Sequence, residues 1–177
     1  MNITSAPRLL VCRAVLACVG WAGGSVRADQ GWVNVQDYFP DRWQDDKQLD
    51  LRAFIQQAFD ENPRVFFPGS NDADAPLLYH TTAGLVVPAG HQVDFAPNHR
   101  LVRLPSKGHM IQLLDRVRFS GAIIDGNKYN HWPKFEDMGK GDSTLRIESY
   151  CVVEDVVLYN TPGIAFYSYG NYNKVYR

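Results

Sequence analysis

Cysteine, clusters of basic residues and long hydrophobic segments are all scarce in this 177-residue sequence. Two of its three cysteines, Cys12 and Cys18, lie in the first 28 residues, so the rest of the chain keeps only Cys151 and forms no internal disulfide. The lack of a basic run argues against a nucleic-acid partner, and no basic amphipathic helix points to a membrane surface. The apolar run over 14–22 has about nine residues, too few to span a bilayer.

Acidic residues are absent from the first 28 positions, which have the layout of a secretory signal peptide. A basic start is followed by the apolar run over 14–22 and by small residues up to Ala28. This order predicts cleavage after Ala28 and a secreted or periplasmic protein. The alternative is a lipoprotein attached through Cys18, although Leu16 fits that signal poorly.

The chain after Ala28 has the composition of one globular domain. Without the three arginines of the signal, 15 basic and 19 acidic residues remain, a formal net charge of −4 with histidine neutral. A chain of this length buries roughly 70% of its unfolded surface, enough for a substantial core. Cys151 lies in the apolar run "YCVVED", so we expect a buried thiol in a strand.

One helix and many short strands are predicted. Leu51, Phe54, Ile55, Ala58 and Phe59 form one apolar stripe at helical spacing. Asp50 is the expected N-cap of this helix, and Asn62-Pro63 is expected to end it. Short β-rich runs separated by Gly, Pro, Asn or Asp cover 64–69, 77–80, 84–90, 92–95, 100–104, 109–114, 116–119, 122–125, 144–147, 151–158, 163–169 and 173–177.

These runs repeat. Phe119 in "RVRFSGAIIDGN" corresponds to Val153 in "YCVVEDVVLYN", and Val153 corresponds to Val175 at a spacing of 22. The spacing of 34 between Phe119 and Val153 equals 22 plus a 12-residue insertion, and Val93 precedes Val117 by 24. Three short strands in each period of 22 to 24 residues predict an all-β, right-handed parallel β-helix. An antiparallel sandwich is the competing fold, but it does not explain the repeat.

Four segments resemble the N-terminal part of the pectate-lyase superfamily of β-helix proteins: "VNVQDYFPD", "DLRAFIQQAFDENPRVFFPG", "GLVVPAGHQVDF" and "VRFSGAIIDGN". The resemblance covers about Val33 to Arg177. It implies that the amphipathic helix caps the N-terminal end of the β-helix. It identifies the fold more than the chemistry, because lyases, hydrolases, epimerases and depolymerases share it.

The expected organisation has three parts. Residues 1–28 are the signal peptide, 29–69 an extended segment with the capping helix and first strand, and 70–177 the coils of the β-helix. Arg177 falls early in a new coil without a polar closing segment, which would expose strand edges. We therefore expect the chain to be the N-terminal portion of a longer protein, and we expect little or no turnover from residues 29–177 alone.

Alternation along the strands predicts a column of outward side chains. Leu145 and Ile147 are expected to point inward, as are Ile111, Leu113, Ile164 and Phe166, leaving Met110 and Thr144 outside. Gln112, Arg146 and Tyr167 would then stack in successive coils, with Glu148 and Tyr169 beside them. Tyrosine rings suit sugar rings, and an arginine suits a uronate carboxylate, so this column is a candidate site for an acidic polysaccharide. The plainer interpretation is an ordinary solvent-facing sheet surface.

The insertion after "AIIDGN" holds the other candidates. His131 or Lys134 would serve as a base toward a sugar C5 proton, together with Arg146, and Trp132 would bind substrate. Asp125 is first a turn residue and only second a metal ligand, for which calcium is the expected ion. Otherwise no cofactor is evident. A decorated surface loop is the plainer interpretation of this segment.

The resemblance to active subfamilies fails at their catalytic motifs. Where alginate epimerases of this fold have a YGFDPH-like motif, this chain reads "GIAFYSYG", with Tyr167 and Tyr169 in place of Asp and His. The paired aspartates and GHG motif of polygalacturonase-like hydrolases are absent. The leading hypothesis is a secreted polysaccharide lyase-like enzyme acting on an acidic, uronate-containing glycan. The rival is a non-catalytic glycan-binding or structural, adhesive β-helix module.

Overall fold

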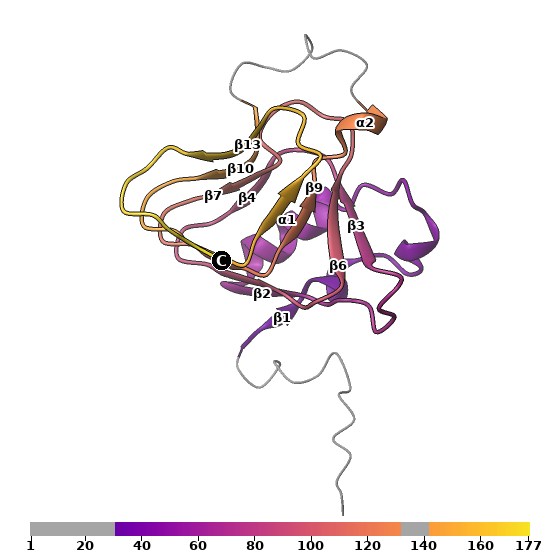
Figure 1. Ribbon diagram of the computed structural model, residues 1–177. Helices are drawn as coiled ribbons and strands as arrows, with labels where there is room; N and C mark the ends of the chain where they lie inside the picture. The colour runs from indigo at the N-terminus through magenta and orange to yellow at the C-terminus, as the bar shows by residue number, and fades with distance from the viewer. Residues whose placement is uncertain (1–30, 132–141) are drawn as a thin grey trace, which may run out of the picture.

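The computed structural model describes residues 31–131 and 142–177, which form three parallel sheets (Figure 1). Sheet A contains β1 (Val33–Asn34), β2 (Arg64–Phe67), β5 (Gln92–Phe95), β8 (Arg118–Ser120), β11 (Val152–Glu154) and β14 (Lys174–Tyr176). Sheet B contains β3 (Leu77–Thr81), β6 (His99–Arg103), β9 (Ile123–Asp125) and β12 (Val157–Tyr159). Sheet C contains β4 (Leu85–Val87), β7 (Ile111–Leu113), β10 (Ser143–Ile147) and β13 (Ile164–Ser168).

From β2 onward the chain passes through sheets A, B and C in a fixed order, and each passage through the three sheets forms one coil. All strand pairings among the described residues are parallel, which rules out the antiparallel sandwich. Every predicted β-rich run contains a strand, and the run 151–158 contains two, β11 and β12. This arrangement is compatible with a parallel β-helix.

The repeat predicted from the sequence is confirmed at one end of the chain and wrong at the other. Phe119 pairs with Val153, and Val153 pairs with Val175. Val93, however, pairs with Phe119 and not with Val117, so the spacing there is 26 residues. The connections between strands differ in length from coil to coil, so a single period does not hold along the chain.

Aromatic rings occupy the core where successive coils meet. The ring centroids of Phe67 and Phe95 lie 4.3 Å apart at 20°, and Phe119 contacts Phe95 edge-on at 5.2 Å. His99 stacks on Phe95 at 4.8 Å and is buried. Cys151 is a free thiol that is buried in the same core as predicted, although it lies directly before β11 and not in a strand. Each coil therefore buries its inward face against its neighbours, since one coil alone has no second layer to cover it.

The predicted helix is α1 (Arg52–Glu61), which follows two short 3₁₀ turns, η2 (Val35–Tyr38) and η3 (Trp43–Asp45). Its apolar stripe is buried at Ile55, Ala58 and Phe59. Leu51 rather than Asp50 is the N-cap residue, and it makes no side-chain capping bond. The Asp50 carboxylate instead accepts the Arg52 N–H and the Thr82 N–H, each at 3.0 Å, which fixes the start of α1 to the chain after β3.

Two residues predicted to face outward are buried. Met110 and Thr144 are 0% and 1% exposed. Alternation fails for Met110 because it lies before β7, where the chain turns from sheet B into sheet C and strand geometry does not yet hold. Leu145 and Ile147 are buried as predicted, whereas Ile164 is 42% exposed because β13 is the outermost strand of sheet C. Among residues 31–131 and 142–177, no helix is long and apolar enough to cross a membrane.

Candidate site on the outer face of sheet C

The predicted column of outward side chains exists. Arg146 on β10 pairs with Gln112 on β7 and with Tyr167 on β13, so the three residues occupy equivalent positions of neighbouring strands. Figure 1 shows β4, β7, β10 and β13 side by side in this order. Strand pairing therefore fixes the spacing of these side chains, which gives the column a rigid support.

Arg146 lies at the centre of the column and contacts Glu148, His109 and Tyr169. Its Nη2 donates to Glu148 Oε1 at 2.9 Å, and its Nη1 lies 3.3 Å from His109 Nε2. The guanidinium carbon lies 5.0 Å from the centroid of the Tyr169 ring, a cation–π contact. Its Nε is buried and has no hydrogen-bond partner. The side chain is 24% exposed, so a charged group remains accessible from solvent.

Glu148 connects Arg146 to the neighbouring coil. One carboxylate oxygen, Oε1, accepts both from Arg146 Nη2 and from Gln112 Nε2, the latter at 3.0 Å. Its side chain is 19% exposed. The three side chains thus form one polar network across β7 and β10.

His109 is a member of this cluster that the sequence prediction missed. Its Nδ1 lies 2.9 Å from Ser143 Oγ and 3.2 Å from the Ser143 backbone nitrogen. In the tautomer with its hydrogen on Nε2, Nδ1 accepts the Ser143 backbone N–H. In the tautomer with its hydrogen on Nδ1, the ring donates to Ser143 Oγ instead, and Nε2 accepts from Arg146 Nη1. Burial lowers the pKa of His109, and the positive charge of Arg146 lowers it further. The imidazole is therefore neutral at neutral pH.

Two tyrosines form the open side of the column. Tyr167 and Tyr169 are 38% and 66% exposed, and their ring centroids lie 6.4 Å apart at an angle of 49°. Since Tyr169 also covers the Arg146 guanidinium, one side of the ring supports the cation. Exposed rings beside a cation provide apolar surface and charge within one site.

The structure describes only some of the other residues that the sequence predicts for the site. His131 is the last residue of α2 (Lys128–His131), and only its backbone is described. Trp132 and Lys134 lie outside the described residues. The insertion itself is confirmed by its ends, because β9 ends at Asp125 and β10 begins at Ser143.

Asp125 makes the contacts of a turn residue. Its Oδ1 accepts from the Asn127 backbone N–H at 2.8 Å and from Asn160 Nδ2 at 3.2 Å. Asn127 has a φ of 53°, a left-handed conformation that asparagine tolerates. Burial, and then the nearby charge of Asp125, raise the pKa of Tyr159 to about 12. Within 31–131 and 142–177, no group of three or more His, Cys, Asp or Glu residues is arranged to hold a metal ion.

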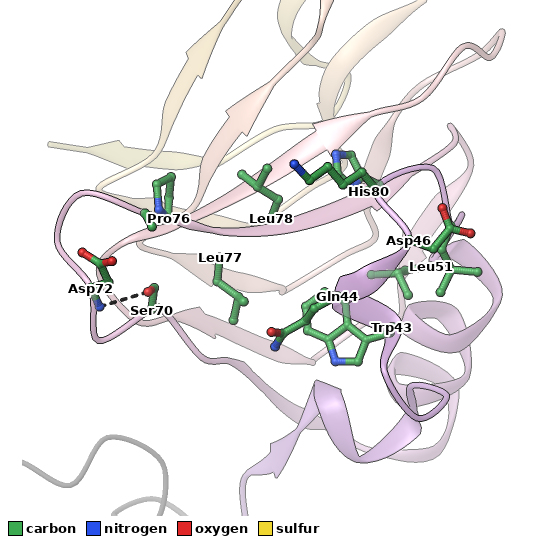
Figure 2. A pocket seen from close by; sticks show the side chains of 13 residues that line it. Trp43, Gln44, Asp46, Leu51, Ser70, Asp72, Pro76, Leu77, Leu78 and His80 are labelled. Carbon is green, nitrogen blue, oxygen red and sulfur yellow. Dashed lines mark hydrogen bonds between the residues drawn. The ribbon is translucent and has the colours of Figure 1, made fainter.

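A separate cavity of about 360 Å³ lies beside the edge strand β3 (Figure 2). In Figure 2, Leu77 points toward Trp43, while Ser70 and Asp72 lie on the loop at the far side. Asp46, Lys47 and His80 also line it, so acidic, basic and apolar groups are mixed. None of the residues predicted to bind or transform a glycan lines this cavity.

Comparison with protein-family models gives no match for this chain, and neither curated protein sequences nor solved structures give one.

Proposed function

We propose that the protein is a right-handed parallel β-helix of the pectate-lyase superfamily type, secreted and lyase-like, that acts on an acidic, uronate-containing polysaccharide. The outer face of sheet C is the proposed glycan site. The observation that carries the proposal is the Arg146 guanidinium at the centre of the column, flanked by the exposed Tyr169 ring and the His109 imidazole.

The chemistry of these groups suits a uronate unit. An arginine binds a carboxylate through parallel N–H···O bonds, and charged hydrogen bonds of this kind are stronger than neutral ones. The Tyr167 and Tyr169 rings offer apolar surface to the C–H face of a sugar. Register along sheet C repeats outward positions in successive coils, which suits a linear polymer better than a single sugar.

The proposed reaction is β-elimination. His109 Nε2 removes the C5 proton of the uronate, the C5–H electron pair forms the C4=C5 double bond, and the C4–O bond breaks. The leaving oxygen takes up a proton. In the tautomer with its hydrogen on Nδ1, neutral His109 has a lone pair on Nε2 for the first step once Arg146 Nη1 binds the uronate carboxylate instead, and the lowered pKa of His109 favours the neutral ring. Arg146 stabilises the negative charge that spreads onto the carboxylate as the proton leaves.

Binding of polygalacturonate and alginate to the purified protein tests the site, with dextran as a neutral control. Arg146→Gln should weaken binding to the acidic polymers about tenfold or more, because a charged hydrogen bond is lost. Arg118→Gln is the matched control, since Arg118 forms a similar pair with Glu154 on sheet A. Absence of binding, or binding that Arg146→Gln leaves unchanged, would refute the proposed site.

Release of unsaturated uronate tests the chemistry separately. His109→Gln should abolish any release while glycan binding persists, since Arg146 and the tyrosines remain. Binding without release, both by this chain and by a longer homologue, would contradict the lyase reaction and favour the glycan-binding module.

A further inference from the structure

The Arg146 guanidinium already has a carboxylate partner, Glu148, which directly follows the end of β10. Glu148 Oε1 accepts from Arg146 Nη2 at 2.9 Å and from Gln112 Nε2 at 3.0 Å. We infer that Glu148 is a built-in competitor for the ligand carboxylate, so the protein's own side chain limits its affinity for acidic glycans. This inference rests on the proposed function, because it concerns the same site.

The geometry of arginine makes the competition direct. A carboxylate binds a guanidinium in a bidentate manner along the Nη1–Nη2 edge or along the Nε–Nη2 edge, and Nη2 belongs to both. Glu148 holds a hydrogen of Nη2, whereas Nε is buried without a partner. His109 Nε2 lies beside Nη1. Because Nε is buried, a ligand carboxylate approaches the Nη1–Nη2 edge, where it comes next to the Glu148 charge or takes its place.

Glu148 and Arg146 are also well placed for this effect to be measurable. Their side chains are 19% and 24% exposed, so water screens their charges less than it screens those of a fully exposed pair. Like charges brought together at a binding site oppose association. Gln112 gives a second hydrogen bond to the same Glu148 oxygen, which keeps the carboxylate at the site when no ligand is present.

Glu148→Gln is the decisive variant, because an amide oxygen still accepts from Arg146 and Gln112 but carries no charge. Affinity for polygalacturonate should rise about two- to fivefold, the range expected when an ion pair worth up to about 1 kcal/mol is removed. Binding of dextran should not change. Glu148→Thr, which also removes the charge, should shift affinity in the same direction if the glutamine variant folds poorly.

Two further variants identify the cause of the change. Glu154→Gln removes the same charge from the Arg118–Glu154 pair on sheet A and should leave binding unaltered, which excludes a general effect of net charge. In an Arg146→Gln background, Glu148→Gln should raise affinity less, because the competition for the guanidinium is gone and only the charge repulsion remains.

The outcomes distinguish this inference from the proposed function. Wild-type binding that depends on Arg146 but weakens, or does not change, in Glu148→Gln would overturn the competitor role alone. Weaker binding would make Glu148 a positioning residue for Arg146. Wild-type binding that is absent or independent of Arg146 would overturn both.

Discussion

The side-chain amide of Gln56 pairs with the backbone of Val86 in the manner of a neighbouring strand. Gln56 Nε2 donates to Val86 O, and Gln56 Oε1 accepts from Val86 N, both at 2.8 Å. Val86 lies on β4, the edge strand of sheet C, which has no strand on its other side among the described residues. The helix α1 thus covers this end of the coil and satisfies its edge, which otherwise would invite pairing with another chain.

Replacement of this glutamine should be costly. Gln56→Ala leaves both backbone groups of Val86 without their partner, and we expect a loss of about 2–3 kcal/mol in the free energy of unfolding. Urea denaturation measures it. Gln57→Ala is the matched control, because the Gln57 side chain is exposed and donates to Glu61 Oε1 on the same helix. Gln57→Ala should lower the free energy of unfolding by no more than about 0.5 kcal/mol. Equal costs at the two positions would contradict the edge-capping role.

Stability should fall as the pH drops below about 6.5, the ordinary pKa of histidine. His99 is buried, its Nε2 accepts from the Ile123 N–H at 3.0 Å, and its Nδ1 lies 2.6 Å from Ala96 O. Burial lowers its pKa in the folded state. Below the unfolded-state pKa of His99, the unfolded chain therefore binds a proton that the folded chain does not bind. The stability that neutral His99 contributes is fully present above that pKa and is lost as the pH falls below it.

Urea denaturation of wild type and His99→Gln between about pH 5 and about pH 8, on both sides of the ordinary histidine pKa, checks this expectation. A glutamine oxygen accepts the Ile123 N–H without titrating, so the variant should lose part of the pH dependence. His109, whose pKa is also lowered, should retain the remainder. A pH dependence unchanged by His99→Gln would show that this residue does not control acid stability.

Asp125 should behave as a turn residue. Asp125→Ala removes the acceptor for Asn127 N–H and Asn160 Nδ2, and we expect a cost of about 1 kcal/mol. Asp125→Asn retains an acceptor oxygen and should remain close to wild type in thermal melts. Melts with added calcium test the alternative role. A calcium-dependent rise in wild-type Tm that Asp125→Asn abolishes would assign a metal to this position instead.

Tyr169 should contribute to glycan binding through its ring. Tyr169→Ala removes both the exposed aromatic surface and the contact with Arg146, so affinity for polygalacturonate should fall about three- to tenfold. Tyr169→Phe keeps the ring and should bind almost as wild type. Tyr172→Ala is the control, because Tyr172 is also exposed but stacks on Tyr150 and not on Arg146. A loss of affinity in the control of the same size would contradict a specific role.

Much of the fold was readable from the sequence because it depends on local patterns. Alternation within β7, β10 and β13 was enough to predict the column of Gln112, Arg146 and Tyr167, since side chains in a strand point to opposite faces in turn. The helical stripe of α1 follows from spacing in the same way. The repeat from Phe119 to Val175 was also correct, because those coils have clear turn signals.

The partners of side chains at the corners and between coils came only from the tertiary structure. His109 precedes β7, so alternation gives no direction for its ring, and only the register of β7 with β10 brings its Nε2 to Arg146. The pairing of Val93 with Phe119 depends on the length of a connection, which a fixed period does not predict. The sequence alone therefore determined which faces exist, because side-chain alternation is a property of each strand. Contacts between coils were decided by folding, because they depend on how far each turn carries the chain before the next strand begins.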